Sequence, residues 1–224
     1  MTRRIGAWWA LAVVLGLPLG PAHAQPPGAA VRALDVRSFR PVEGPTSGPA
    51  VYYRVEEWPT GAGLSGRYRP PMETVTMGID VPEELRGRVR QVRWRWRVRT
   101  FPTGGDECTP GRGDSAASVS LAFKRGLKWY VLRYVWSPIT AAGSVCDRKR
   151  NLFVARDIVV LKSGGAPDVW REEIVDVRRA FVEHFANGNL AADVPDLVGI
   201  GVMTDGDQTN SESAADWDGF ELRY

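Results

Sequence analysis

Histidine is almost absent from this sequence. The 224 residues include two histidines, His23 and His184, and we expect His23 to be lost with an N-terminal leader. A zinc or copper site built from several histidines is therefore excluded, and so is catalysis by paired histidines. His184 lies on the apolar stripe of the one helix that we predict, where a packed or half-exposed residue is expected.

Long apolar runs are also missing, except at the start of the chain. Arg3 and Arg4 precede an uncharged run over 5–19, which ends in the small-residue cleavage pattern Ala22-His23-Ala24. These features predict a signal peptide. The run is too short to span a membrane comfortably. No cysteine follows the cleavage site, so a lipid anchor is not expected.

Cleavage before Gln25 divides the chain into three parts. We predict a signal peptide over 1–24, a flexible lead over 25–33 and a single domain over 34–224. The protein is then periplasmic or secreted, with no transmembrane segment after cleavage.

Cysteine occurs only twice. Cys108 and Cys146 both lie in segments rich in turn-forming residues, and the predicted compartment is oxidising. A disulfide between two loops is the expected arrangement. A reactive pair is not favoured, because the two cysteines lack a C-x-x-C spacing.

An excess of charge of one sign is absent as well. Loss of the leader removes two arginines, which lowers the formal net charge from +3 to +1. A nucleic-acid-binding protein is therefore not supported. The composition is 44% hydrophobic and 25% charged, with 24 glycines and 16 prolines, which indicates a globular and loop-rich domain.

Short segments that alternate with a period of two residues dominate the rest of the chain. The clearest covers 91–100, where Val92, Trp94, Trp96 and Val98 share one face. Such alternation is typical of a strand that is buried on one side. Further strands are expected over 51–55, 74–81, 118–123, 128–136, 156–162, 170–177, 197–203 and 220–224. One short helix is expected over 176–185, ending at Asn187-Gly188. The pattern predicts an all-β antiparallel sandwich, a jelly roll of eight to ten strands.

Several of these segments carry a family resemblance. They are Trp94-Arg95-Trp96-Arg97-Val98, Gly113-Asp114-Ser115-Ala116-Ala117, Tyr134-Val135-Trp136, Trp170 and the run from Gly199 to Thr209. In this order they resemble a bacterial secreted family known as domain of unknown function 3047, over about residues 50–224. The resemblance implies a β-sandwich similar to galactose-binding domains and carbohydrate-binding modules, and it implies export. Cys108 and Cys146 are not part of the common pattern.

The loop that begins at Asp205 has the spacing of a cation-binding loop. Asp205, Asp207 and Thr209 stand at positions 1, 3 and 5, and Asp216 stands at position 12. Calcium takes six to eight oxygen ligands, which alternate residues of a tight loop can supply. The match to an EF-hand is partial, because position 12 is not glutamate and the loop follows a strand. A polar turn whose side chains cap their own backbone is the other interpretation.

A second acidic loop contains Asp106, Glu107 and Asp114. If it lies at the same end of the sandwich as Asp205 and Asp207, the two loops form one site. A pair of these carboxylates would then be able to serve as the acid and base of a glycosidase, which requires a specific separation across a cleft.

Tryptophan is the most informative residue type that is present. Seven tryptophans follow the leader, and aromatic rings of this kind stack on sugar rings. Trp94 and Trp96 are expected in the core. Trp136, at a strand end, and Trp58, before a proline, are the candidates for an exposed platform. The arginines on the other face of 91–100 are expected to face solvent or to pair with acids on adjacent strands; they are Arg93, Arg95, Arg97 and Arg99.

Three functions fit these observations. The first is an exported non-catalytic protein that binds a saccharide or a cell-envelope glycan, with Trp136, Trp58 and Asp114 near the ligand. A structural calcium would be held by Asp205, Asp207, Thr209 and Asp216. The second is a polysaccharide hydrolase or lyase that uses Asp114, Asp205 or Asp207. The third is a structural or adaptor protein of the envelope. No motif for a phosphate-binding loop or a serine nucleophile is present.

Overall fold

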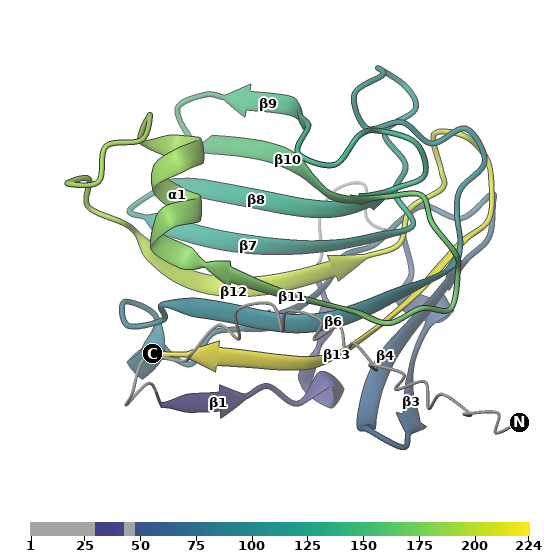
Figure 1. Cartoon of the computed structure of the whole chain (residues 1–224), viewed down its shortest axis with the longest axis horizontal. Helices are drawn as coiled ribbons and strands as arrows, with labels where there is room; N and C mark the ends of the chain where they lie inside the picture. Colours follow the sequence, from purple (N-terminus) through teal and green to yellow (C-terminus); the bar gives the residue numbers. More distant parts are fainter. Residues whose placement is uncertain (1–29, 43–47) are drawn as a thin grey trace, which may run out of the picture.

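The fold is a sandwich of two β-sheets, as the sequence predicts (Figure 1). The computed structural model describes residues 30–42 and 48–224. The predicted signal peptide lies outside the described residues. In the part of the chain that is described, no helix is long and apolar enough to cross a membrane.

The first sheet has six strands. Over 92–99 its strand β6 alternates between buried apolar residues and arginines, as predicted, and β6 pairs with β11 on one side and β13 on the other. The strands of the sheet, in spatial order, are β11 (Arg171–Asp176), β6 (Gln91–Thr100), β13 (Ser213–Arg223), β4 (Gly61–Tyr68) and β3 (Tyr53–Trp58), with β1 (Val31–Ala33) beside β13.

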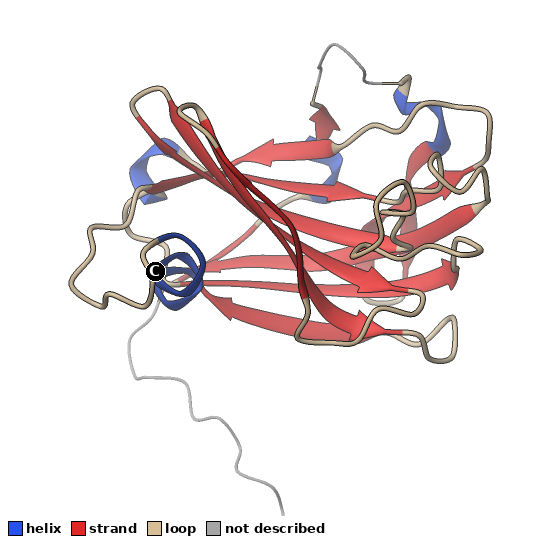
Figure 2. Cartoon of the chain, turned by 90° about the horizontal axis from the view of Figure 1, so that it is seen from above, coloured by secondary structure: helices blue, strands red, loops and turns tan. Residues whose placement is uncertain are grey.

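The second sheet has seven strands. All neighbours in it are antiparallel except β8 and β10, which run parallel. The strands, in spatial order, are β2 (Arg40–Pro41), β5 (Met77–Asp80), β12 (Asp196–Met203), β7 (Ala117–Arg125), β8 (Lys128–Ser137), β10 (Val154–Ser163) and β9 (Val145–Arg150). Figure 2 shows that the strands are strongly twisted and that several loops gather at the right-hand end of the molecule.

The core lies between the inner faces of the two sheets. Trp94 and Trp96 are fully buried there, as predicted, and their rings meet edge to face with centroids 5.8 Å apart. Trp217 of β13 and Phe123 of β7 are also fully buried. Large aromatic side chains of this kind supply most of the buried apolar area of a sandwich core.

The one α-helix among the described residues, α1 (Val177–Phe185), lies at the left end of the sandwich in Figure 1. Asp176 caps its first turn by accepting a hydrogen bond from the backbone N–H of Arg179, and Phe181 packs against Phe123. His184 is packed, as predicted, and its Nδ1 lies 2.9 Å from the buried carboxylate of Asp157.

Two segments differ from what the sequence predicts. Within the expected flexible lead, Val31–Ala33 forms β1 and pairs with the edge of β13. The last strand begins at Ser213 and not near residue 220, because its small residues pair with both β4 and β6. Three 3₁₀ turns lie between strands, at Val36–Ser38, Ala50–Tyr52 and Glu83–Leu85.

The predicted pairing of the two cysteines is confirmed, but Cys146 lies in the strand β9 and not in a loop. Cys108 and Cys146 are bonded, and their Cα atoms lie 4.9 Å apart. The bond ties the loop over 101–116 to β9, at the edge of the seven-stranded sheet.

Candidate functional site

A groove of about 620 Å³ lies on the outer face of the seven-stranded sheet. Side chains of directly paired residues on neighbouring strands lie on the same face of a sheet. On these strands, the side chains that alternate with the core-facing ones therefore line the groove. The lining comes from β2, β5, β12, β7 and β8, together with Ser38 before β2, Val42 after it and Thr76 before β5. Residues in the lining include Arg40, Val42, Thr76, Gly78, Asp80, Ser120, Ala122, Trp129, Val131, Gly199 and Gly201.

Small residues keep the floor of the groove open. Gly78 of β5, Gly201 of β12 and Ser120 of β7 are consecutive neighbours across three strands. A Cβ atom on Gly201 would come within 2.9 Å of the Thr76 methyl group, so the glycine is needed for this close approach. A row of larger side chains would fill the space that the groove now offers to a ligand.

Trp129 is the aromatic residue in this lining, and its side chain is 39% exposed. The Nζ atom of Lys124 lies 4.8 Å from the centroid of its ring. The sequence indicates the position of Trp129 through the alternation along its strand. Tyr130 and Leu132 face the core, so Trp129 faces outward. The sequence prediction places the exposed platform at a strand end and in a loop, so it does not include Trp129.

Polar groups flank the groove. Arg40 is held in place because its guanidinium donates to the carbonyl oxygens of Arg37 and Phe39 at 2.6 and 2.8 Å. Asp80 of β5 is exposed, and Ser120 lies on the floor. These groups supply both hydrogen-bond donors and acceptors to the groove.

Arg133 joins the face that carries the groove to an acidic centre at the end of the sheet. It is the register partner of Ser120 on β8, so it shares that face. Its guanidinium donates to the Ser115 hydroxyl at 3.3 Å and to the Asp205 carboxylate at 3.2 Å.

The acidic centre consists of Asp114, Asp205 and Asp207. One carboxylate oxygen from each residue lies within 4.8 Å of the others. Asp114 comes from the loop before β7, whereas Asp205 and Asp207 follow β12. These loops lie side by side at the right of Figure 1. The structure thus brings together three of the carboxylates that the sequence places in two separate loops.

Asp114 holds the loop after β12 in place. Its side chain is completely buried. One oxygen accepts from the backbone N–H of Gln208 at 3.2 Å, and the other accepts from both the N–H and the hydroxyl of Thr209 at 2.6 Å. The role of Asp114 in this structure is therefore to bind another loop, and its burial keeps it away from a ligand in the groove.

Asp205 is the most perturbed group of the centre. It is 4% exposed, and one of its two oxygens, Oδ1, has no hydrogen-bond partner among the described residues. Burial raises the pKa of Asp205 to about 7; the Arg133 charge opposes this shift, and the charges of Asp114 and Asp207 add to it. Asp207 is exposed at the rim of the centre.

Asp216 and Thr209, which the sequence predicts as calcium ligands together with Asp205 and Asp207, are engaged in other contacts. Asp216 lies in β13, where Arg67, Arg97 and Arg99 donate to its fully buried carboxylate at 2.7–2.9 Å. It is separated from the acidic centre because the chain has already entered the six-stranded sheet at this position. The Thr209 hydroxyl is bonded to Asp114.

The other two acids of the first loop also lie apart from the centre. Asp106 accepts hydrogen bonds from Thr109 and from Thr140, both at 2.7 Å. Glu107 is buried, and its Oε2 accepts from the hydroxyl of Ser137. Its Oε1 has no partner among the described residues. Burial raises the pKa of Glu107, although the hydrogen bond from Ser137 opposes this shift.

The sequence predicts Trp136 and Trp58 as exposed platforms for a sugar, but neither ring is fully exposed. Trp136 is 3% exposed; it packs against Trp96 and donates to the Gly164 carbonyl at 2.8 Å, so it belongs to the core. Trp58 is half-buried over β4, where a Cβ on Gly63 would strike its ring. Trp58 also meets Trp170 edge to face, with ring centroids 5.3 Å apart.

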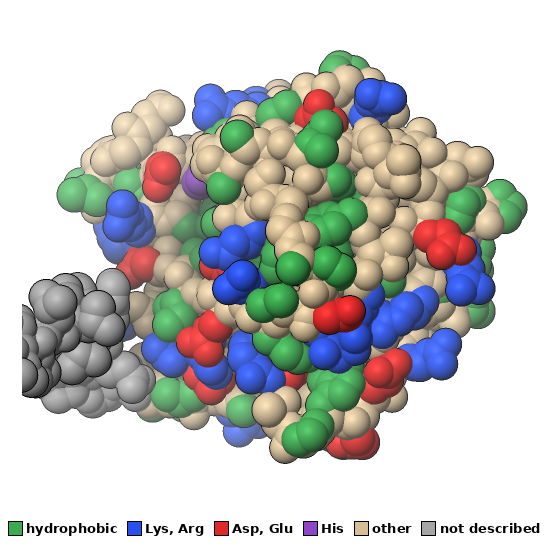
Figure 3. All heavy atoms as spheres, turned by 45° about the vertical axis from the view of Figure 1, so that its right-hand side comes forward, with side chains coloured by type: hydrophobic (Ala, Val, Ile, Leu, Met, Phe, Trp, Pro, Cys, Tyr) green, Lys and Arg blue, Asp and Glu red, His purple; other side chains and the backbone are tan. Residues whose placement is uncertain are grey.

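The four arginines of β6 pair with acids on the adjacent strands and loops. Arg95 binds Asp218 in a forked pair, at 2.7 Å from Nε and 2.5 Å from the terminal nitrogen. Arg97 lies over the Trp170 ring at 4.6 Å. In Figure 3, basic and acidic side chains are interspersed across the lower half of the visible face. The positive charges of the β6 arginines are thus largely compensated by carboxylates of the protein itself.

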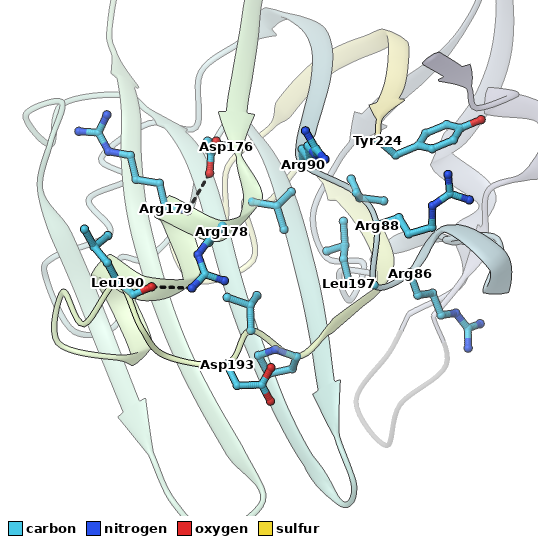
Figure 4. Close-up of a pocket in the computed structure, with 15 residues that line it drawn as sticks. Arg86, Arg88, Arg90, Asp176, Arg178, Arg179, Leu190, Asp193, Leu197 and Tyr224 are labelled. Carbon is cyan, nitrogen blue, oxygen red and sulfur yellow. Dashed lines mark hydrogen bonds between the residues drawn. The ribbon is translucent and has the colours of Figure 1, made fainter. Parts of the chain in front are cut away.

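A second hollow, of about 800 Å³, lies near the start of α1 and is rich in arginine. Figure 4 shows that the labelled arginines point in different directions. Arg178 donates to the carbonyl oxygens of Leu190 and Ala192, at 2.5 and 3.0 Å, Arg86 donates to Val81 at 3.1 Å, and Arg88 lies over the Tyr224 ring. These contacts hold the arginines apart, and no convergent anion site results.

A family match covers most of this architecture. Residues 76–221 match the family described as protein of unknown function (DUF3047), which is more than half of the chain. The chain belongs to the DUF3047 family. The DUF3047 match includes both loops of the acidic centre and four of the five strands that line the groove; β2 lies before it. No curated protein matches the sequence.

Solved structures with a similar fold are distant in sequence. The xyloglucanase domain of NopAA, a type three effector from Sinorhizobium fredii solved in complex with cellobiose, is 10% identical; the match covers 88% of this chain and 98% of that one, with a TM-score of 0.45. Endoglucanase cel12A from Rhodothermus marinus is 9% identical, with 88% and 96% covered and a TM-score of 0.46. The GH12 endoglucanase 3 from Trichoderma harzianum is 9% identical, with 90% and 99% covered and a TM-score of 0.42.

Proposed function

We propose that this protein is an exported, non-catalytic saccharide-binding protein whose ligand lies in the groove of the seven-stranded sheet. The observation that carries the proposal is the exposed indole of Trp129 beside a floor of small residues on a surface that holds about 620 Å³. Ligand sites of small molecules commonly have volumes of this order.

The chemistry of the lining suits a sugar. The apolar face of a pyranose ring stacks on an indole, and its hydroxyl groups need both donors and acceptors at the edge. Arg40 offers donors, Asp80 offers acceptors and the Ser120 hydroxyl offers both. The groove extends across several strands, which suits a chain of sugar units better than a single one.

The distribution of carboxylates favours binding over hydrolysis. Paired carboxylates cleave a glycosidic bond from opposite sides of it. Asp80 is the one acid among the described residues of the groove lining. Asp114 and Asp205 of the acidic centre are buried and bonded to loop or arginine groups, which limits their access to a polysaccharide.

Export of the protein remains part of the proposal. The disulfide between Cys108 and Cys146 supports an oxidising compartment, and the predicted signal peptide supports passage to the periplasm or the medium. Expression of the full chain in a bacterium, followed by cell fractionation and N-terminal sequencing, tests this part. Recovery of an uncleaved chain in the cytoplasm would contradict it.

The binding proposal is tested by retention of the oxidised protein on immobilised envelope glycans and plant polysaccharides. We expect at least one of them to retain the protein, with a loss of about tenfold or more in affinity for Trp129→Ala. Trp170→Ala is the matched control, because Trp170 is a half-buried tryptophan whose ring lies against Arg95 and Arg97 of the other sheet. The control should bind as the wild type does.

Other results would favour one of the two alternatives. Shortened oligosaccharides in the flow-through would indicate a hydrolase or lyase. A protein that binds no glycan at millimolar concentration would contradict saccharide binding, and reproducible capture of one envelope protein would then favour the adaptor interpretation.

A further inference from the structure

Two loops deliver three carboxylates to one point at the end of the seven-stranded sheet. The ligand atoms of Asp114, Asp205 and Asp207 lie within 4.8 Å of one another. One guanidinium, that of Arg133, contacts the group. Three acidic groups therefore meet a single positive charge, and two of the three are buried, where the low dielectric strengthens the repulsion between their ionised forms.

One member of this group, Asp205, carries an unsatisfied buried oxygen. The Asp205 side chain is 95% buried, and its Oδ1 accepts no hydrogen bond from any described residue. A buried carboxylate oxygen that lacks a donor costs free energy unless a further group binds it. Arg133 binds the other oxygen, Oδ2, so Oδ1 is the atom of Asp205 that still lacks a partner among the described residues.

We propose that Asp114, Asp205 and Asp207 bind a calcium ion. The donors are all carboxylate oxygens, as a hard divalent cation requires, and the histidine and cysteine ligands typical of zinc sites are not among them. Calcium accepts irregular sets of six to eight oxygens, so backbone carbonyl groups and water would complete a set drawn from two loops. Asp207 is exposed and gives the ion a route from solvent.

The ion would strengthen a connection that is already present. Asp114 holds the loop after β12 through Gln208 and Thr209, and the Gly113 N–H donates to the Gln208 side chain at 3.0 Å. Calcium would add ligands from both loops to this junction. The site is separate from the Trp129 groove, so it stands or falls independently of the saccharide proposal.

The test is calcium binding by the oxidised protein after treatment with chelator. We expect one ion per chain by isothermal titration and a rise of about 5 °C in melting temperature at saturating calcium. Terbium serves as a luminescent probe of the same site. Burial raises the pKa values of Tyr52 and Tyr68, and both tyrosines lie close enough to Asp205 and Asp207 for the carboxylate charges to raise these pKa values further, and close enough to sensitise the terbium emission.

Asp207→Asn is the informative variant, because Asp207 is exposed and its replacement leaves the buried contacts of Asp114 and Asp205 in place. It should lower calcium affinity at least tenfold. Asp196→Asn removes an exposed carboxylate from the other end of β12 and should bind calcium as the wild type does. Absence of binding at millimolar calcium would overturn the proposal, and so would equal affinity in the wild type and Asp207→Asn.

Discussion

One carboxylate oxygen of Asp114 accepts two hydrogen bonds from Thr209, a residue 95 positions further along the chain. The backbone N–H and the hydroxyl of Thr209 both lie 2.6 Å from this oxygen. Asp114 also sits six residues after Cys108, whose disulfide reaches β9. The loop over 101–116 is thus fastened to opposite regions of the same sheet, and this fixes the end of the sandwich beside the groove.

Asp114→Asn should weaken this junction. An amide offers one acceptor in place of two, so its NH₂ group would face backbone and hydroxyl donors that are buried. We expect a loss of about 2 kcal/mol in the free energy of unfolding, measured by urea denaturation in chelator. Asp193→Asn is the control, since the Asp193 side chain is 90% exposed, and it should change stability by less than about 0.5 kcal/mol. Equal effects of the two substitutions would contradict the account of Asp114.

Glu107 should make stability depend on pH. Because burial raises its pKa in the folded protein, the folded state holds a proton on Glu107 that the unfolded state has already released above pH 4.5. The contribution of Glu107 to stability is therefore greatest below pH 4.5 and is lost as the pH rises through the folded pKa.

Glu107→Gln removes this titration while retaining an acceptor for the Ser137 hydroxyl. The stability of the variant relative to the wild type should increase as the pH rises from 4.5 toward neutrality, in denaturation curves taken at several pH values. Glu212→Gln, at a side chain that is 60% exposed, should show no such trend. A constant difference between Glu107→Gln and the wild type would refute the assignment.

Asp216 should behave as the central anion of the six-stranded sheet. Burial disfavours its charge, but hydrogen bonds from Arg99 and Arg97 outweigh this effect and lower the pKa of Asp216. Its contribution to stability is fully present above its ordinary pKa and is lost as the pH falls from that value through the lower pKa of the folded state. Asp216→Asn leaves neighbouring arginines without their shared partner and should cost about 3 kcal/mol at neutral pH.

The control for Asp216 is Asp168, which also pairs with Arg99 but has a side chain that is 58% exposed. Asp168→Asn should cost less than about 1 kcal/mol, since exposed ion pairs contribute little. Thermal or urea denaturation of both variants provides the comparison. If Asp216→Asn were as stable as Asp168→Asn, the buried network would not have the role described.

The strands were most predictable where side chains alternate clearly. The bounds of β6 and the burial of Trp94 and Trp96 follow from parity alone. The strand β4 was missed, because Gly61, Gly63 and Gly66 give it the composition of a turn; in the structure, Gly63 makes room for the ring of Trp58.

The candidate site was predictable only in part. Spacing selected Asp205 and Asp207, but which other acid meets them depends on how two loops pack at the end of the sheet. Spacing also assigned Asp216 to the same loop. That assignment was wrong, because Asp216 lies in β13, and where β13 begins depends on its pairing with the distant strands β4 and β6. The outward position of Trp129 could be predicted from the alternation of side chains along its strand. The burial of Trp136 could not, because it depends on Gly164, in a turn that follows another strand.

The most direct test of the saccharide proposal is an NMR titration of the ¹⁵N-labelled protein with the glycan that binds best. The account predicts that the indole resonance of Trp129 and the amide resonances of Gly78, Ser120 and Gly201 shift together and saturate with one dissociation constant. Shifts confined to Trp58 and Trp170, on the opposite sheet, would contradict a ligand in the groove.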